Sequence, residues 1–315
     1  MRQKRTVPCR MLSSEILDKK AKNRSKQFYK RKHGANDFWE RIDLMRILTP
    51  KVLGILNITE DSFSDGGLYL KSDKALEKAR RLIEDGATII DIGAASSNPA
   101  TKAIPPQVEI DRLRPVIDYL FAKDIPISVD TFNPEVQRYV LQRKAQYIND
   151  IQGFPHPEIY PELAASDCKL IVMHSVQRLG PATVVETKPE QVFAEMLEFF
   201  TKRLKSLQNA GISSDRIILD PGMGFFLGSN PESSIHVLKN MHRLKDHFNL
   251  PMLVGVSRKS FLGAIVGGRT VAERGPATLA TEIYLSYKGV DYIRTHDVRA
   301  LNDALKVLKS LDTTE

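Results

Sequence analysis

The feature that most restricts the fold of this chain is a series of eight short apolar runs that alternate with helical patterns after Pro50. The runs are largely apolar on both faces, as is typical of parallel strands that are covered on both sides. Eight such units over about 265 residues predict a (β/α)8 TIM barrel, which usually has ~250 residues. The expected strands are residues 51–57, 88–94, 126–131, 146–151, 169–174, 216–222, 251–257 and 291–296.

The helical patterns between these runs carry their own start signals. Asn-Pro at 133–134 and again at 230–231 places an N-cap residue before a proline in the first helical turn. An open doubly wound sheet is the alternative fold, but it usually has a glycine-rich phosphate loop, and no G-x-G-x-x-G follows the first run. The expected helices are residues 72–87, 133–145, 188–211, 230–248, 273–289 and 298–311.

The basic charge of the chain is concentrated at its N-terminus. Residues 1–50 contain 14 Lys and Arg against 5 Asp and Glu, whereas the remainder contains 32 and 33. This division predicts a basic N-terminal extension, residues 1–50, before a barrel domain, residues 51–315. The extension is interpreted either as a disordered arm or as sequence upstream of a translation start at Met45. A neutral barrel argues against nucleic-acid binding, except through this extension.

The composition also bears on the cellular compartment. No apolar run approaches the ~18 residues that cross a bilayer, and the basic N-terminus lacks the apolar segment of a secretory signal. The two cysteines, Cys9 and Cys168, form no motif. We therefore expect a cytoplasmic protein with reduced thiols and no membrane partner.

Polar residues close every one of the eight expected strands. In a TIM barrel these ends meet at one mouth, where active sites lie, although a single strand-terminal Asp often only caps the next helix. Carboxylate and amide edges suit a flat heterocycle with N–H donors, and basic groups on the last two strands suit phosphate. The closing residues are Asn57, Asp91, Asp130, Asn149 with Asp150, His174, Asp220, Ser257 to Lys259, and Arg294 with His296.

Six blocks at these strand ends resemble, in order, the motifs of dihydropteroate synthases. They read "GILNITEDSFSDGG", "SVDT", "IND", "DPGMGF", "VSRKSFLG" and "RTHDV". The resemblance implies condensation of 7,8-dihydropterin-6-ylmethyl diphosphate with p-aminobenzoate, with release of diphosphate, in folate biosynthesis. It also implies Mg²⁺, a dissociative SN1-like path, and a mobile lid at 59–67 that excludes water.

The same resemblance implies roles for individual residues. Asp130, Asn149, Met173, Asp220 and Lys259 would bind the pterin, and Asp130, Asp220 and Lys259 among them would be catalytic. Asn57, Arg294 and His296 would bind the diphosphate, with Asn57 also at the metal. Ser97, Pro99, Phe225, Ser257 and Arg258 would bind p-aminobenzoate.

Two segments depart from the common pattern of the family. The second loop reads "GAASSNPA", with Ser97 and Asn98 where Thr and Arg are usual, so Asn98 is given no phosphate role. About two extra residues surround Phe225 and Phe226. Both departures resemble the sulfonamide-resistant, mobile-element-encoded branch. We predict that a phenyl ring, with Phe225 favoured over Phe226, stands beside the arylamine pocket and clashes with the drugs. A hydrophobic plug under the loop is the alternative.

Two other functions stay open at this point. A pterin-dependent methyltransferase would share the barrel and its acidic groups but would not need "SRK" or the lid. A non-catalytic pterin-binding protein would have lost catalytic groups. The family resemblance further implies a homodimer formed through the late helices.

Overall fold

The computed structural model describes residues 49–58, 68–95, 104–177 and 185–312, all within a compact unit that spans Ile47–Glu315. The N-terminal extension, the expected lid at 59–67, and Ser97, Asn98 and Pro99 lie outside the described residues. The assignments made for them therefore stay predictions.

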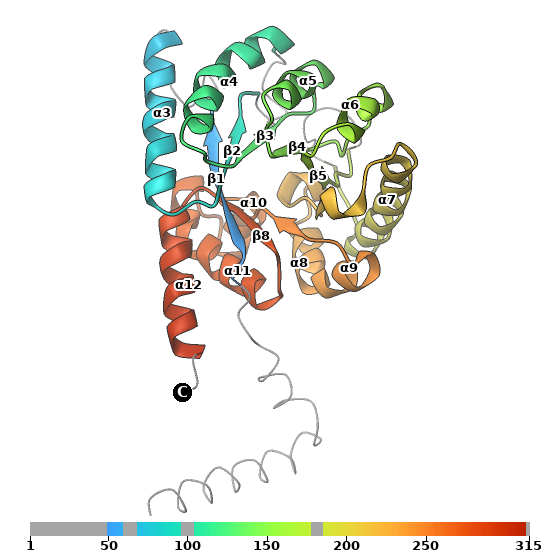
Figure 1. Cartoon of the computed structure of the whole chain (residues 1–315). Helices are drawn as coiled ribbons and strands as arrows, with labels where there is room; N and C mark the ends of the chain where they lie inside the picture. The colour runs from blue at the N-terminus through green and yellow to red at the C-terminus, as the bar shows by residue number, and fades with distance from the viewer. Residues whose placement is uncertain (1–48, 59–67, 96–103, 178–184, 313–315) are drawn as a thin grey trace, which may run out of the picture. The chain divides into compact units, whose positions relative to one another are not determined.

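Eight parallel strands form the centre of the unit, as predicted (Figure 1). Their order is β6-β5-β4-β3-β2-β1-β8-β7. A bridge between Leu219 of β6 and Met252, just before β7, closes the barrel, and the Leu219 amide donates to Pro251 O at 2.9 Å. The strands are β1 (Lys51–Asn57), β2 (Ile89–Gly93), β3 (Ile127–Asp130), β4 (Tyr147–Asp150), β5 (Lys169–Met173), β6 (Ile217–Asp220), β7 (Leu253–Val254) and β8 (Tyr292–Thr295).

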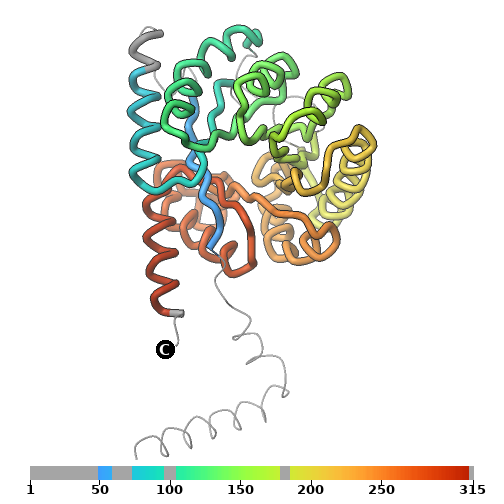
Figure 2. Tube along the Cα trace, in the orientation of Figure 1, coloured from blue at the N-terminus to red at the C-terminus, as the bar shows by residue number. Residues whose placement is uncertain are grey.

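Helices surround the strands in a ring, and the chain trace alternates between the two layers (Figures 1 and 2). This arrangement confirms the TIM barrel. The α-helices are α3 (Leu68–Glu84), α4 (Pro106–Phe121), α5 (Pro134–Gln142), α6 (Tyr160–Ala164), α7 (Pro189–Asn209), α8 (Pro231–Lys239), α9 (Met241–Phe248), α10 (Ser260–Ile265), α11 (Gly275–Tyr287) and α12 (Val298–Asp312). Short 3-10 turns are η2 (Pro157–Ile159), η3 (Ser214–Arg216), η4 (Gly224–Leu227) and η5 (Val271–Arg274). No described helix is long and apolar enough to cross a membrane.

The predicted helix starts are confirmed where a cap was identified. Asn133 accepts a hydrogen bond from the Glu135 amide at 2.9 Å, and Asn230 accepts one from Glu232 at 3.0 Å. Each cap satisfies one amide that the first helical turn would otherwise leave without a partner. Both helices begin with proline directly after the cap.

Two helix predictions need correction, and one helix was missed. The helix expected over 230–248 is two helices, because the chain leaves helical geometry at Asn240, where ψ is 14°. Helix α3 begins at Leu68, earlier than its predicted start at residue 72. Helix α4 was not predicted at all. Its interior Pro115 is a sequence signal for a helix break, yet the helix continues through it to Phe121.

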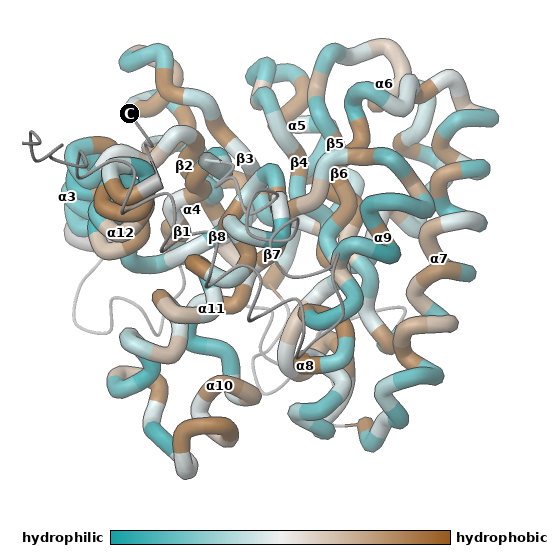
Figure 3. Tube along the Cα trace, turned by 90° about the horizontal axis from the view of Figure 1, so that it is seen from below, coloured by the Kyte–Doolittle hydropathy of each residue, from teal (hydrophilic) through white to brown (hydrophobic). Residues whose placement is uncertain are grey.

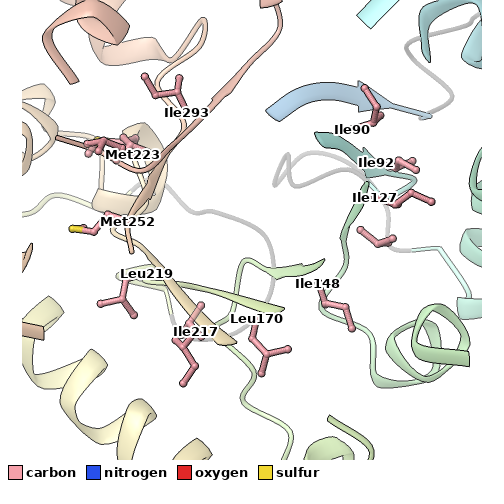
Figure 4. Packing of buried hydrophobic residues seen from close by; sticks show 14 of the residues in the cluster. Ile90, Ile92, Ile127, Ile148, Leu170, Ile217, Leu219, Met223, Met252 and Ile293 are labelled. Atoms are coloured by element: carbon pink, nitrogen blue, oxygen red, sulfur yellow. The ribbon is translucent and has the colours of Figure 1, made fainter. Parts of the chain in front are cut away.

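The alternation of side chains along the strands divides the core into two parts. One set points outward to the helices, and Figure 4 shows Ile148, Leu170 and Ile217 of this set turned away from the barrel interior. Along α7, hydrophilic and hydrophobic residues interchange, as expected for a helix with one face on that layer (Figure 3). The other set fills the barrel as an apolar floor of Leu53, Ile89, Tyr147, Ile171, Ile218, Leu253 and Tyr292.

Candidate active site

Directly above the apolar floor, the inward-facing side chains become polar. A residue two positions further along a strand points the same way, so the floor residues Ile89, Tyr147 and Ile218 are followed inward by Asp91, Asn149 and Asp220. Asn149 and Asp220 border a pocket at the carboxyl end of the barrel. Its wall is formed by Asp130, Asn149, Ile151, Met173, Asp220, Gly222, Met223, Phe226, Gly255, Lys259 and Arg294.

Arg294, in the wall of this pocket, joins the acidic residues of two neighbouring strands, Asp91 of β2 and Asp130 of β3. Its Nε donates to Asp91 Oδ2 at 2.5 Å, and its Nη2 donates to Asp130 Oδ2 at 2.8 Å. Asp91 is fully buried, whereas Arg294 and Asp130 keep 18% and 20% of their side chains exposed. One guanidinium therefore holds two carboxylates, and the exposed edge of Asp130 remains available to a ligand.

Burial shifts the pKa values of the ionisable groups in this pocket. It raises the pKa of Asp130 to about 7, with Arg294 opposing the shift and Asp91 adding to it. It raises the pKa of Asp220 to about 6, although the Gly222 amide donates to that carboxylate at 2.8 Å. For Lys259, burial and then Arg294 lower the pKa to about 8. Two acids and a lysine thus titrate near neutral pH, as is common at functional sites.

Asn149 supplies a hydrogen-bonding edge that the described protein does not use. The residue is 2% exposed, and its Oδ1 has no hydrogen-bond partner among the described residues. A buried polar atom without a partner is costly, so a ligand donor is the natural way to satisfy it. With Asp130 and Asp220 beside it, the pocket can accept several hydrogen bonds from one flat, N–H-rich ring.

The loop after β6 places its two phenylalanines in different surroundings. Gly222 has a φ of +68°, and a Cβ there would lie 2.3 Å from His174 O. This tight turn leads into η4, where Phe226 is 8% exposed and its ring centroid lies 4.8 Å from Lys259 Nζ. Phe226 therefore borders the polar pocket.

Phe225, by contrast, is 44% exposed and lines a second pocket. That pocket is also bordered by Ser260 and Phe261. The two pockets adjoin, because Gly224 and Ser260 of the second follow Met223 and Lys259 of the first directly in the chain. The sequence prediction that Phe225 stands beside the arylamine pocket stays a prediction.

The segment Ser257 to Lys259 connects the pocket to the last strand. Ser257 Oγ accepts a hydrogen bond from the His296 amide at 3.2 Å and lies 3.0 Å from His296 Nδ1. Burial, followed by the field of Arg294 and Arg258, lowers the pKa of His296 to about 3, so this imidazole is neutral at physiological pH. Arg258 is exposed, and its φ of +60° marks backbone strain of the kind that accumulates at functional sites.

The structure brings six of the predicted site residues to the wall of the first pocket, namely Asp130, Asn149, Met173, Asp220, Lys259 and Arg294. Asn57 ends β1 with its side chain half-buried, opposite Gly93 in the neighbouring strand. Ser257 lines neither pocket, because its side chain faces His296.

Two strand-terminal residues considered at the sequence level face away from the barrel interior. His174 is fully buried with its ring edge-on to Phe199 at 5.4 Å, and Asp150 binds Gln137 and the Gln152 amide. Each follows an inward residue of the pocket, so the alternation of the strand directs it outward.

The sequence analysis counted Asp91 among the strand-end residues without giving it an individual role, and it ranked Phe226 below Phe225 for the arylamine pocket. Asp91 lies in the middle of β2 in the same inward phase as Ile89, so strand alternation alone could have assigned it to the site. For Phe226 the sequence carries no comparable signal. Phe225 and Phe226 are neighbours in the same 3-10 turn, and no local pattern predicts which of their side chains faces which pocket.

No group of three or more Cys, His, Asp or Glu in the described ranges could hold a metal ion by itself. Mg²⁺ commonly takes one or two protein oxygens and completes its shell with water and substrate phosphate. The amide oxygen of Asn57 at the barrel mouth fits this limited role, provided that a phosphorylated ligand supplies the remaining oxygens.

Comparison with known proteins now identifies the family. A family model described as pterin binding enzyme matches residues 53–296. Dihydropteroate synthase type-3 from Escherichia coli is 60% identical over 261 residues, which cover 83% of this chain and 99% of that protein. The chain belongs to the dihydropteroate synthase family. The enzyme of E. coli strain K12 is more distant, at 36% identity over 263 residues, 83% of this chain and 91% of that protein. The family places this chain among the transferases of folate biosynthesis.

Solved dihydropteroate synthases share the fold described above. The enzyme of Xanthomonas albilineans with 4-aminobenzoic acid superposes with a TM-score of 0.77 at 33% identity, covering 85% of this chain and 95% of that one. The same enzyme in complex with 7,8-dihydropteroate gives a TM-score of 0.74 at 32% identity, covering 86% and 96%. The resemblance inferred from six sequence motifs is thereby confirmed.

Proposed function

We propose that this protein condenses 7,8-dihydropterin-6-ylmethyl diphosphate with p-aminobenzoate to give 7,8-dihydropteroate and diphosphate. One observation carries the proposal: a buried pocket of carboxylate, amide and ammonium groups adjoins a second pocket walled by phenyl rings. The first suits a pterin and the second suits an arylamine. Family membership, and the substrates named with the solved relatives, support the same assignment.

In this mechanism the pterin lies in the first pocket, with its N–H edges on Asp130, Asn149 and Asp220. The C–O bond between the methylene and the diphosphate breaks, and its electron pair leaves with the oxygen. Positive charge then spreads from the methylene into the ring, and the two carboxylates stabilise it at short range in a medium of low dielectric. A dissociative path is therefore favoured.

The diphosphate is held at the barrel mouth by Asn57, Arg294 and His296. Mg²⁺, when bound with the substrate through Asn57, supplies charge neutralisation for the leaving group. Arg294 contributes a permanent cation, and the neutral ring of His296 contributes an N–H donor. The loop at 59–67 is assigned the role of a lid over this end.

p-Aminobenzoate occupies the second pocket, with its nitrogen directed at the methylene. The lone pair of that nitrogen forms the new C–N bond, and the nitrogen then loses one proton to the departing diphosphate or to water. Phe225 provides the flat wall, Arg258 is assigned to the carboxylate, and Ser97 and Pro99 are assigned to the same substrate. No strong general base is required, because the methylene is already electrophilic.

A synthase assay tests the proposal. Purified full-length protein is incubated with both substrates and Mg²⁺, and 7,8-dihydropteroate is measured by chromatography. Formation of product that depends on both substrates supports the proposal. Tight binding of the pterin diphosphate without any product would instead establish a non-catalytic pterin-binding protein.

We also propose that the enzyme is insensitive to sulfonamides, and that Phe225 is the reason. Its ring is 44% exposed at the wall of the second pocket. In this proposal the ring lets a flat arylamine pass and clashes with the group carried on a tetrahedral sulfonyl. The type-1 and type-2 relatives from E. coli, 46% and 48% identical, are closer to this chain than the strain K12 enzyme is.

The variant Phe225→Gly tests this claim against Phe225→Leu, which keeps much of the bulk. We expect Phe225→Gly to lower the sulfamethoxazole concentration that halves turnover by about tenfold or more, the factor for ~1.4 kcal/mol of relieved clash. Turnover without drug should largely persist. Unchanged drug insensitivity in Phe225→Gly would refute the role and favour a purely structural plug.

A cytoplasmic location and a homodimer complete the proposal. Apolar side chains exposed on α10, α11 and α12 support an interface through the late helices. They are Ile265, Val266, Tyr284, Val307 and Leu311.

A further inference from the structure

The turn that follows β7 holds an arginine in a backbone conformation that glycine normally occupies. The Lys259 amide donates to Val256 O at 3.1 Å, which closes a four-residue turn with Ser257 and Arg258 at its centre. Arg258, the third residue, has a φ of +60°, and a turn with a positive φ at this position favours Gly or Asn there. A residue with a Cβ is disfavoured in left-handed geometry by about five- to thirtyfold.

The place of Arg258 in the chain does not explain this geometry. Three other described residues with a side chain and a positive φ, Asp124, Lys144 and Asn249, lie within three residues after the end of a helix. A left-handed residue is usual there, because it helps to satisfy the last carbonyl groups of the helix. Arg258 instead precedes a helix, α10, so groups outside the turn must hold its backbone.

Two side chains from the region of α11 bind the backbone of Arg258. Its amide donates to Thr278 Oγ1 at 3.1 Å, and its carbonyl oxygen accepts from Arg274 Nη1 at 2.9 Å. Thr278 is buried on α11, and Arg274 is the last residue of η5. The Nε of Arg274 also donates to Arg269 O at 3.0 Å, which fixes the guanidinium. One hydrogen bond is worth about fivefold in an equilibrium constant, so the two together offset the strain at Arg258.

The left-handed turn separates two side chains that serve different parts of the proposed site. In an extended strand, residues 257 and 259 would point the same way. Here Ser257 Oγ lies 3.0 Å from His296 Nδ1. Lys259 instead lines the first pocket, with its Nζ 4.8 Å from the ring centroid of Phe226. The geometry of Arg258 therefore directs Lys259 into that pocket.

We propose that Thr278 and Arg274 are positioning residues, which hold Arg258 in its left-handed conformation and thereby aim Lys259 at the pterin. The inference rests on the proposed function, because Lys259 is assigned there to the pterin pocket. Neither Thr278 nor Arg274 borders the first or the second pocket. Each acts through the backbone of Arg258.

The test measures binding of the pterin diphosphate, with Mg²⁺, to the intact protein by isothermal titration calorimetry. Thr278→Val removes the hydroxyl acceptor with little change of shape, and Thr278→Ser keeps it. Thr281→Val is the matched control, because the Thr281 hydroxyl lies on the same helix but donates to Ala277 O at 2.8 Å. Arg258→Gly removes the strain itself, since glycine adopts a positive φ freely.

We expect Thr278→Val to weaken binding of the pterin diphosphate by about fivefold, the value of one hydrogen bond. Without that bond the turn is left-handed for a smaller fraction of the time, and the apparent affinity falls with the fraction of protein that is competent to bind. Thr278→Ser and Thr281→Val should bind as the wild type does. In the Arg258→Gly background, Thr278→Val should have almost no further effect, because the left-handed form no longer depends on the bond.

A second variant keeps the test decisive if Thr278→Val does not fold. Arg274→Met breaks the other bond to Arg258 from a partly exposed position. It should weaken binding of the pterin diphosphate by a similar factor, and this loss should also disappear in the Arg258→Gly background.

Three outcomes would overturn the inference. The first is wild-type affinity for the pterin diphosphate in both Thr278→Val and Arg274→Met. The second is a loss of affinity that persists undiminished in the Arg258→Gly background, which would leave Thr278 and Arg274 a general structural role. The third is a wild type that binds no pterin diphosphate. Only the third also refutes the proposed function, so the two failures are distinguishable.

Discussion

Replacing Asp130 by Asn should change both the strength and the pH dependence of pterin binding. The exposed edge of Asp130 faces the pocket while Arg294 holds its other oxygen at 2.8 Å. A hydrogen bond from a pterin N–H group to this carboxylate is charge-assisted, so its loss costs about 1.5–3 kcal/mol, or roughly 10- to 150-fold in affinity. The amide of Asn retains one acceptor, which places the expected loss toward the lower end.

The pH dependence gives the sharper signature. The carboxyl group of Asp130 has a pKa of about 7, so only about a tenth of it is ionised at pH 6. Wild-type affinity should therefore rise with pH until about pH 7 and fall again above about pH 8, where Lys259 loses its proton. In Asp130→Asn the rise of pterin affinity with pH should move down toward pH 6. The ionisation of Asp220, whose pKa is about 6, then limits binding on the acidic side.

Isothermal titration calorimetry with the pterin diphosphate and Mg²⁺, between pH 5.5 and 9 in about half-unit steps, measures both effects. Asp118→Asn is the control, since Asp118 is an exposed carboxylate paired with Arg143 on the outer helices. The free energy of unfolding should change with pH in the opposite sense to the affinity for the pterin diphosphate. A folded-state pKa above the unfolded value means that wild-type stability falls as pH rises toward 7, and Asp130→Asn should lack that part of the fall. Affinity within twofold of wild type and an unmoved acidic limb would refute the reasoning.

Two further predictions concern the scaffold. Gly222→Ala should unfold at a much lower urea concentration than Gly268→Ala, because both need a positive φ but only the first brings a Cβ to 2.3 Å from a carbonyl oxygen. The left-handed backbone alone costs about 1–2 kcal/mol, so equal losses in the two variants would contradict the proposed clash. Asn133→Ala should cost about 1 kcal/mol of unfolding free energy through loss of the cap on α5, with little effect on turnover. A stability equal to wild type would show that the cap contributes nothing.

The barrel was predictable from the sequence because both of its signals are local. Eight apolar runs and the Asn-Pro helix starts each depend on a few neighbouring residues. The same locality explains the errors in the helices. A proline inside a helical pattern normally predicts a break, so Pro115 hid α4 from the sequence analysis. The structure shows that the helix nevertheless continues through Pro115. Helix α8 ends before Asn240 without a glycine or proline, and the Asn240 side chain donates to His236 O at 2.8 Å.

Within the site, the sequence identified which strand ends matter but not how the side chains pair. Asp130, Asn149 and Asp220 could be chosen by motif, and strand alternation would have added Asp91. The bond from Arg294 to Asp91 joins residues 203 positions apart, so no local pattern contains it. The different surroundings of Phe225 and Phe226 likewise follow from the geometry of one short turn.

The most direct test of the account is a crystal structure of the protein with 7,8-dihydropteroate. We expect the pterin ring on Asp130, Asn149, Asp220 and Lys259, and the aminobenzoyl group in the adjoining pocket against Phe225. A pterin bound elsewhere, or an aminobenzoyl group that leaves the pocket of Phe225 unoccupied, would contradict the two-pocket site on which the proposed reaction depends.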